Sequence, residues 1–312
     1  MKKPGAYDEN GNLICELTKE DVEKDLSCFS IFEEIGIPTK KQWGITKVVL
    51  PYDTTRIGEY LFSECTSLKT ISIPNGLTSI GDFAFNKCEN LASIHLPTSV
   101  RSIGYNTFSD CISLKTVKLP KNIKMIKDNT FFGCESLSSV TIPVGVVSIG
   151  DAAFAHCTSL VDINIPNTVT TINRSAFYNC TSLQSIILPD SIITLDKSVF
   201  EDCKALTEIK LPEGLTKISA YTFAHCTSLQ NINLPKKIAL IEKYAFKDCY
   251  ALSSICLPPQ IAEIECGAFL NCKYLSSVIF DEITYDGRFE LETELKESGV
   301  IVGSDVFANT KL

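Results

Sequence analysis

Hydrophobic positions recur along the chain with a period of 23 residues. One unit runs Leu68-x-x-Ile71-x-Ile73-Pro74-x-x-Leu77-x-x-Ile80-Gly81-x-x-x-Phe85-x-x-Cys88, and polar residues fill most of the other positions. The pattern continues without an insertion between residues 45 and 280. A fixed period of roughly 20–50 residues indicates a solenoid, in which each unit forms one coil and buries its apolar side chains against its neighbours.

Phenylalanine and cysteine mark this period most clearly. The phenylalanines are Phe62, Phe85, Phe108, Phe131, Phe154, Phe177, Phe200, Phe223, Phe246 and Phe269. The cysteines are Cys65, Cys88, Cys111, Cys134, Cys157, Cys180, Cys203, Cys226, Cys249 and Cys272. Coils that pair through strands lie ~4.8 Å apart. We therefore expect a buried column of aromatic rings and a parallel column of small buried thiols.

Each part of the unit predicts a local structure. The alternation Ile71-x-Ile73 predicts a short strand, and Pro74 ends it because proline has no N–H for the ladder. Leu77 to Ile80 predicts a second short extended segment, and Phe85 and Cys88 are spaced as one 3₁₀ or helical turn would place them. The sequence thus predicts an α/β solenoid, a right-handed superhelix of 23-residue coils with a parallel strand face.

The repeat divides the chain into three regions. Residues 1–42 are predicted to form an N-terminal cap with a short helix, because Thr18 is a good N-cap residue and Val22, Leu26 and Phe29 share one helical face. Residues 43–280 form an array of about ten coils. Residues 281–312 form a third region, in which the repeat pattern is interrupted.

This third region has two interpretations. Ile283 to Leu291 predicts a β-hairpin on the turn Asp286-Gly287. Val302 and Phe307 then restart the repeat pattern. The region is either a C-terminal cap that holds a hairpin insertion or the start of a further repeat, and we favour the cap.

The unit resembles the leucine-rich repeats of the BspA-like (Treponema pallidum) class. The resemblance rests on the 23-residue period, the L-x-x-I-x-L-P run, the I-G step and the A-F-x-x-C ending, as in Ala84-Phe85 and Ala153-Phe154, and it covers roughly residues 43–280. It implies a non-catalytic binding module, a cell-surface or secreted adhesin-like protein of a host-associated microbe. It also implies that the strand face is the concave, ligand-binding side.

The candidate binding residues occupy two outward columns on the predicted strands at the centre of the array. They are Thr116, Lys118, Ser139, Thr141, Asp162, Asn164, Ser185, Ile187, Glu208, Lys210, Asn231 and Asn233. This mixture of hydroxyl, amide and charged groups suits a broad protein or glycan ligand better than a small molecule, since no deep pocket is expected. The simpler interpretation is a solvated sheet face with no ligand. We expect the chain to be monomeric.

Charge argues against two classes of partner. The net charge is −8. Residues 1–42 carry 9 acidic and 6 basic residues, residues 281–312 carry 8 and 3, and the array between them carries 20 of each. A neutral array with acidic ends does not favour nucleic acid or an anionic membrane surface, which both require a basic face. No apolar run reaches the ~18 residues that a membrane-spanning helix needs.

The location remains open between two alternatives. No signal peptide is visible in the first residues, so the surface or secreted placement rests on the resemblance, and a cytoplasmic location is the alternative. The corresponding rival functions are an intracellular scaffold for partner proteins and a structural spacer within a longer chain.

Cysteine and histidine provide the only candidate chemistry. We interpret the ten repeated cysteines as reduced structural thiols. Cys15 and Cys28 either pair as a capping disulfide or stay reduced, whereas Cys256 and Cys266 lack the spacing of a zinc site. His156 and His225 stand three coils apart, or ~14 Å, too far to share a metal. The sequence contains no catalytic motif, and we expect no enzyme activity, cofactor or metal.

Overall fold

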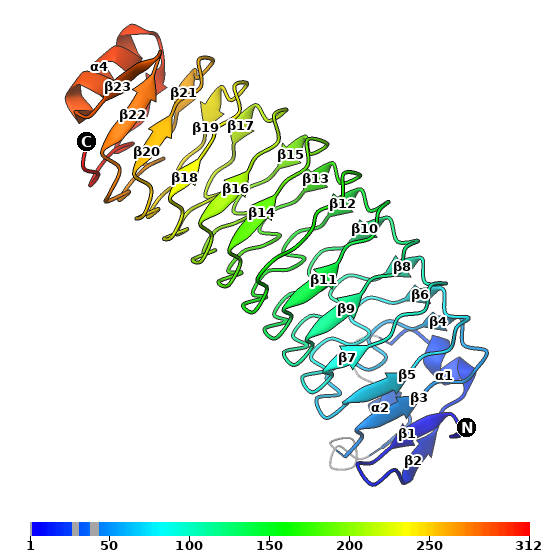
Figure 1. Cartoon of the computed structure of the whole chain (residues 1–312). Helices are drawn as coiled ribbons and strands as arrows, with labels where there is room; N and C mark the ends of the chain where they lie inside the picture. Colours follow the sequence, from blue (N-terminus) through cyan, green and yellow to red (C-terminus); the bar gives the residue numbers. More distant parts are fainter. Residues whose placement is uncertain (1, 27–30, 38–43) are drawn as a thin grey trace. The chain divides into compact units, whose positions relative to one another are not determined.

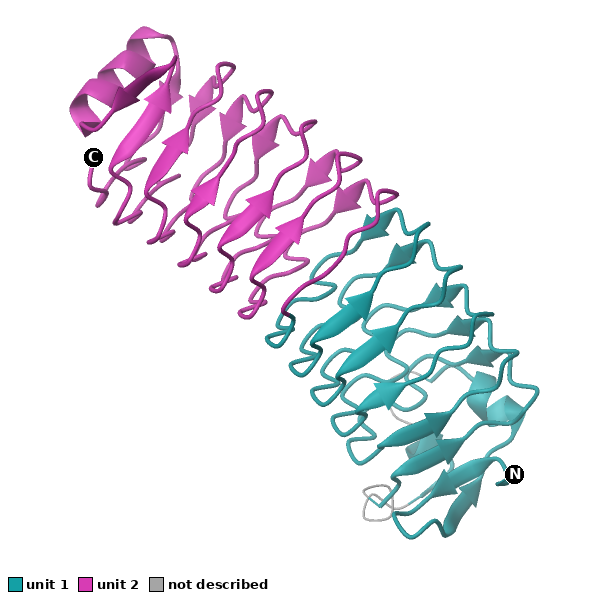
Figure 2. Ribbon diagram, in the orientation of Figure 1, with its two compact units in different colours: residues 1–160 teal, residues 161–312 magenta. Residues whose placement is uncertain are grey.

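The computed structural model describes residues 2–26, 31–37 and 44–312. The chain divides into two compact units, residues 1–160 and 161–312, which are coloured separately in Figure 2. Each unit is a stack of coils, and most coils contribute two short strands joined by turns (Figure 1).

Unit 1 contains the N-terminal region and the first coils. Its elements are β1 (Gly5–Tyr7), β2 (Leu13–Glu16), α1 (Lys19–Glu23), α2 (Ile31–Glu34), β3 (Lys47–Val49), β4 (Arg56–Ile57), β5 (Thr70–Ser72), β6 (Ser79–Ile80), β7 (Ser93–Ile94), β8 (Ser102–Ile103), β9 (Thr116–Lys118), β10 (Met125–Ile126), β11 (Ser139–Thr141) and β12 (Ser148–Ile149).

Unit 2 contains the later coils and the C-terminal region. Its elements are β13 (Thr171–Ile172), β14 (Ser185–Ile187), β15 (Thr194–Leu195), β16 (Glu208–Lys210), β17 (Lys217–Ile218), β18 (Asn231–Ile232), β19 (Leu240–Ile241), β20 (Ser254–Cys256), β21 (Glu263–Ile264), β22 (Ser277–Phe280), β23 (Ile283–Tyr285), α4 (Arg288–Glu297) and β24 (Ile301–Val302).

Strands of successive coils pair in parallel, offset by one repeat. In unit 1 Val117 of β9 pairs with Val140 of β11, and in unit 2 Ile186 of β14 pairs with Ile209 of β16. The predicted solenoid of 23-residue coils is therefore confirmed. In the described chain, helix is confined to α1, α2 and α4, so the molecule is a parallel β-solenoid with little of the helix that an α/β class implies.

The segment that carries Phe and Cys is a series of β-turns rather than the expected 3₁₀ or helical turn. Within it, Ser63 N donates to Tyr60 O and Cys65 N donates to Phe62 O. Tyr60 and Glu64 have positive φ angles of 57° and 60°. Each of these left-handed residues interrupts the right-handed conformation that a helix requires, so no helix continues through the segment. The backbone N–H groups released in this way bond to the next coil: Phe62 N donates to the carbonyl of Ala84 at 2.8 Å.

The turn segments contribute two columns of buried side chains to the core. The phenylalanine rings stack from coil to coil, with centroids 5.4–5.5 Å apart from Phe62 to Phe154 in unit 1. In unit 2 the stack runs from Phe177 to Phe269 and continues to Phe307. All these rings are buried, and the thiols from Cys88 to Cys272 form a second buried column beside them. Each coil thus covers the apolar face of its neighbour.

The N-terminal region supplies backbone donors to the first coil. Leu26 N donates to Glu59 O at 3.0 Å and Ile31 N donates to Leu61 O at 2.8 Å, the bonds that a preceding coil would make. Helix α1 begins after Thr18, whose hydroxyl accepts a hydrogen bond from Asp21 N. Phe29 and Cys28 lie outside the described residues, and Cys15 carries a free thiol.

The predicted hairpin on Asp286-Gly287 is wrong. A hairpin does form, but β22 and β23 turn at Asp281 and Glu282, whose φ angles of 48° and 64° suit a tight two-residue turn. Gly287 instead precedes helix α4, and the helix buries Leu291 and Leu295. Burial of these two leucines on one helical face explains why the Asp-Gly signal does not produce a turn between strands.

Candidate functional site

The candidate site is the outward side of the longer strands, which we call the strand face. In unit 1 the strand face is formed by β3, β5, β7, β9 and β11, and in unit 2 by β14, β16, β18, β20 and β22. Alternate residues of each strand point outward because side chains alternate across a strand. All twelve candidate binding residues are exposed.

On β9 and β11 of unit 1 the strand face carries small hydroxyl side chains and one lysine. Thr116 lies beside Ser139, and Lys118 lies beside Thr141, in register. The buried partners between them are Val117 and Val140, which face the core. This part of the face offers hydroxyl groups and one cation.

On β14, β16 and β18 of unit 2 the strand face is more varied. Ser185 lies beside Glu208, and Glu208 beside Asn231, while Ile187 lies beside Lys210. Asn233 follows directly after β18, and Asp162 and Asn164 are exposed in the coil before β14. Ile187 is 70% exposed and lies beside the charged Lys210.

Two hollows mark this part of unit 2. One, of about 450 Å³, is lined by Ser185, Ile186, Ile187, Glu208, Ile209, Lys210, Leu211, Glu213 and Asn233. The other, of about 310 Å³, is lined by Thr207, Glu208, Ile209, Gln230, Asn231 and Asn233. Glu208, Ile209 and Asn233 belong to both hollows, so the two are neighbours across β16. Sequence reasoning selected six of these twelve lining residues and missed the exposed Thr207, Glu213 and Gln230, which lie beside the outward columns rather than in them.

The buried cysteines act as hydrogen-bond donors. Cys88 Sγ lies 3.2 Å from the carbonyl oxygen of Phe62, and Cys272 Sγ lies 3.1 Å from that of Phe246. Burial raises the pKa of both thiols well above the usual range, so they stay protonated and donate. No cysteine of the described chain is joined in a disulfide, and Cys256 is the only exposed one among them. Within the described residues no group of three His, Cys, Asp or Glu side chains is placed to hold a metal ion.

His156 and His225 occupy a special backbone position. Both have a φ angle of 62°, in the left-handed region. His225 Nδ1 lies 3.2 Å from Asp248 Oδ2, and Asn271 Nδ2 donates to Asp248 Oδ1 at 2.8 Å, so these side chains form a polar row along the turns of unit 2. The position just before cysteine is left-handed in coil after coil, and sequence reasoning missed it. The sequence did contain a signal, because residues that tolerate this conformation are frequent directly before the repeated cysteines. They are Asp110, Gly133, His156, Asn179, Asp202, His225, Asp248 and Asn271.

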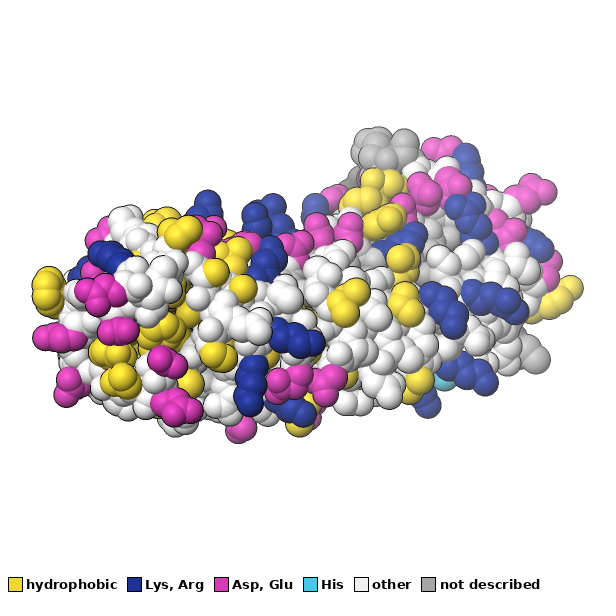
Figure 3. Space-filling model, turned by 90° about the horizontal axis from the view of Figure 1, so that it is seen from above, with side chains coloured by type: hydrophobic (Ala, Val, Ile, Leu, Met, Phe, Trp, Pro, Cys, Tyr) yellow, Lys and Arg dark blue, Asp and Glu magenta, His cyan; other side chains and the backbone are white. Residues whose placement is uncertain are grey.

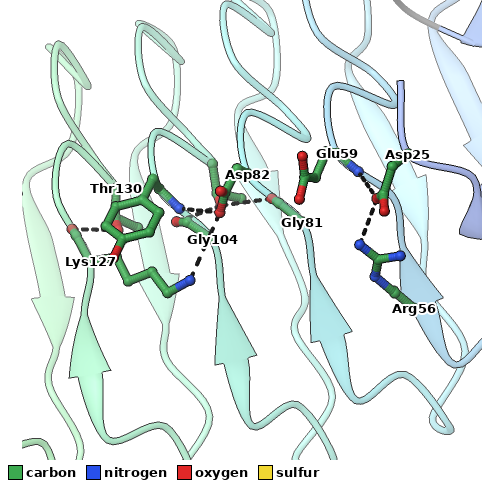
Figure 4. A network of polar contacts seen from close by, with 10 residues as sticks. Asp25, Arg56, Glu59, Gly81, Asp82, Gly104, Lys127 and Thr130 are labelled. Atoms are coloured by element: carbon green, nitrogen blue, oxygen red, sulfur yellow. Dashed lines mark hydrogen bonds and ion pairs between the residues drawn. The ribbon is translucent and has the colours of Figure 1, made fainter. Parts of the chain in front are cut away.

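Polar side chains connect neighbouring coils in unit 1 (Figure 4). Asp82 Oδ1 accepts a hydrogen bond from Tyr105 N at 2.8 Å and lies 3.9 Å from Lys127 Nζ, so one carboxylate connects three coils. At the N-terminal region Asp25 Oδ1 contacts Arg56 Nη2 at 2.6 Å and Glu59 N at 2.9 Å. Partial burial alone would raise the pKa of Asp25, but these two donors hold it below its usual value.

Charges of both signs are interspersed on the surface. In the described part of the face seen in Figure 3, lysine and arginine side chains alternate with aspartate and glutamate, and no broad basic area is visible. None of the described helices is long and apolar enough to cross a membrane.

Comparison with known proteins identifies the repeat. The family model of the BspA type leucine rich repeat region matches in six copies, over residues 40–161, 124–250 and 194–291. The chain belongs to the BspA-type leucine-rich-repeat family. The resemblance predicted from the sequence is thereby confirmed. No curated protein matches this BspA-type chain.

Solved structures of bacterial leucine-rich-repeat proteins resemble this BspA-type chain. A leucine-rich repeat protein from Bacteroides ovatus is 26% identical, with a TM-score of 0.63 over 85% of this chain and 76% of that one. A leucine rich cell surface protein from Faecalibacterium prausnitzii is 26% identical, with a TM-score of 0.51 over 85% and 84%. A leucine-rich repeat protein from Eubacterium ventriosum, 21% identical with a TM-score of 0.55 over 93% and 88%, shares the fold.

Proposed function

We propose that this protein is a non-catalytic module that binds a protein or glycan on its strand face, at the cell surface or after secretion. The observation that carries the proposal is the strand face itself. Its twelve candidate residues are exposed and differ from coil to coil, although the core beneath them repeats. The similar protein from Faecalibacterium prausnitzii is described as a cell surface protein, which supports the location.

The first test concerns location. Intact source cells are treated with protease, and the released peptides are analysed by mass spectrometry for this chain. Release without lysis supports a surface protein. Protection until lysis contradicts the surface proposal.

The second test concerns binding. The full chain is screened against extracellular-matrix proteins and glycan arrays, and any ligand is then tested against a Lys118→Glu, Lys210→Glu double variant. Both lysines are exposed on the strand face, so reversal of both charges is expected to change the affinity of any ligand held there without unfolding the coils. Unchanged binding would exclude the strand face as the contact surface.

An intracellular scaffold is the second candidate. It is favoured by the column of buried cysteine thiols from Cys88 to Cys272, which are not joined in disulfides, since a reducing compartment keeps thiols in that state. Protease protection combined with binding to a cytoplasmic partner protein would support this alternative.

A further inference from the structure

Four charged side chains around the hollows of unit 2 have no ionic partner in the described chain. Glu208, Lys210 and Glu213 line the larger hollow, and Asp190 lies beside it, since its Oδ1 accepts a hydrogen bond from Glu213 N at 3.1 Å. No salt bridge within 4.0 Å involves any of the four in the described part of the protein, although eleven other pairs do form there. Three carboxylates against one ammonium group make this rim locally acidic and available to a cation from outside.

Ile187 adds an apolar contact beside these charges. It is 70% exposed and lies in register with Lys210, at the end of the hollow opposite the asparagines. Covering an exposed isoleucine with an apolar group of a partner is favourable because it removes apolar surface from water. Ile187 therefore suits an aliphatic side chain of a ligand.

The amide side chains at the other end of the hollows complete the surface. Gln230, Asn231 and Asn233 are exposed and each presents a donor and an acceptor. A peptide backbone also carries one donor and one acceptor per residue, so these amides match it well. The lining of both hollows contains no aromatic residue on which a sugar ring could stack.

We propose that the two hollows on β14, β16 and β18 form a binding site for an extended peptide segment that carries an aliphatic residue and, nearby, a lysine or arginine. The aliphatic side chain covers Ile187, the cation lies against Glu208 and Glu213, and the amides of Asn231 and Asn233 bond the peptide backbone. This inference rests on the proposed binding function and names its partner.

The spacing of the coils sets the spacing in the peptide. Neighbouring coils lie ~4.8 Å apart, and an extended peptide rises ~3.3 Å per residue. Side chains of an extended peptide point to the same side every second residue. The aliphatic and basic residues are therefore expected about two positions apart, so that both face the sheet.

The test uses defined peptides with the full chain. An array of capped heptapeptides places one isoleucine and one arginine at separations of one to four positions on a glycine–serine background. The best peptide is then measured by fluorescence anisotropy. We expect the two-position spacing to bind best, and replacement of its arginine by glutamate to lower the affinity about tenfold or more, as loss of a central contact does.

Matched variants locate the site. Ile187→Ser is expected to reduce the affinity about tenfold, and Glu208→Lys to abolish arginine-dependent binding. The control is Ile193→Ser, because Ile193 is 71% exposed but lies before β15 on the other strand row. Circular dichroism of each variant verifies that it is folded.

Several outcomes would overturn the inference. One is equal binding by the Ile187→Ser and Ile193→Ser variants, and another is array binding no stronger than to the glycine–serine background. A third is a matrix protein or glycan that binds the strand face but is displaced by no heptapeptide. In that last case the proposed binding function stands and only the peptide site is wrong.

Discussion

The turn segments and the strand face of this protein follow opposite rules. In the turn segments phenylalanine and cysteine recur in coil after coil, and the rings from Phe62 to Phe269 are fully buried. On the strand face the outward residue changes from Lys118 to Thr141 in one step, and both are exposed. A side chain that packs between two copies of itself cannot change size alone, whereas one that faces solvent can. Repetition thus marks the core and variation marks the surface available for function.

The largest expected effect is on the phenylalanine column. Phe131 stacks on Phe108 at 5.5 Å and on Phe154 at 5.4 Å, and is fully buried. Phe131→Ala should lower the free energy of unfolding by about 3–5 kcal/mol because it leaves a cavity. Urea denaturation followed by circular dichroism measures the change. Phe289→Ala is the control, since Phe289 is 80% exposed, and a similar loss there would refute the distinction between core and surface.

A second effect concerns the left-handed positions in the turns. Asn129 has a φ angle of 54°. Asn129→Val should lower the free energy of unfolding by about 1–2 kcal/mol, because a β-branched side chain is strained in this conformation. Asn129→Gly, which removes the strain, should cost less than the valine variant when both are denatured in urea. The reverse order would mean that the left-handed turn does not constrain this position.

Thr54 is a break in the apolar pattern, and correcting it should stabilise the protein. It occupies the position of Leu77 in the first coil, is fully buried, and its hydroxyl has no hydrogen-bond partner among the residues that the structure describes. Thr54→Val should raise the free energy of unfolding by about 1 kcal/mol, since an unpaired buried polar group is unfavourable.

The matched control for Thr54 is Thr107→Val. Thr107 is equally buried, but its hydroxyl donates to Gly104 O at 2.8 Å. The same substitution should therefore destabilise the protein there, by about 1 kcal/mol. Thermal melts that shift in the same direction for both variants would contradict this account.

The smallest effect is expected on the strand face. Thr141→Ala and Lys118→Ala should each change the free energy of unfolding by less than about 0.5 kcal/mol, because neither side chain packs in the core. A larger loss in urea denaturation would show that the strand face supports the fold and is not free to vary.

The same distinction explains what the sequence could predict. Strong periodicity identified the coils, because burial in a stack requires like residues at like positions. The left-handed turns were missed because Tyr60 and Phe83 adopt positive φ angles without being glycine or asparagine, as stacking to the next coil outweighs their local preference. The hairpin was misplaced because Asp286-Gly287 is a strong local signal, whereas β22 and β23 already pair across Asp281 and Glu282, and the chain after Gly287 forms a helix that buries Leu291.

The hollows could not be predicted, since their shape depends on side chains from three coils. The sequence did single out Ile187 as an aliphatic residue in an outward column. The sequence did not indicate that Asp190 and Glu213 would lie together near Ile187, because the contact between these two residues joins turns in adjacent coils.

The hydrogen bonds between turn segments give the stack a direction. In each coil the N–H groups of alternate turn residues point to the following coil, as Phe62 N does to Ala84 O, and the N-terminal region donates to the first coil in the same sense. Outside these turn residues the sense reverses, as Asn90 N donates to Thr66 O of the preceding coil. Because the same set of bonds recurs at successive junctions, we expect the chain to tolerate removal or duplication of one whole 23-residue coil, which would leave the bonds at the new junction intact.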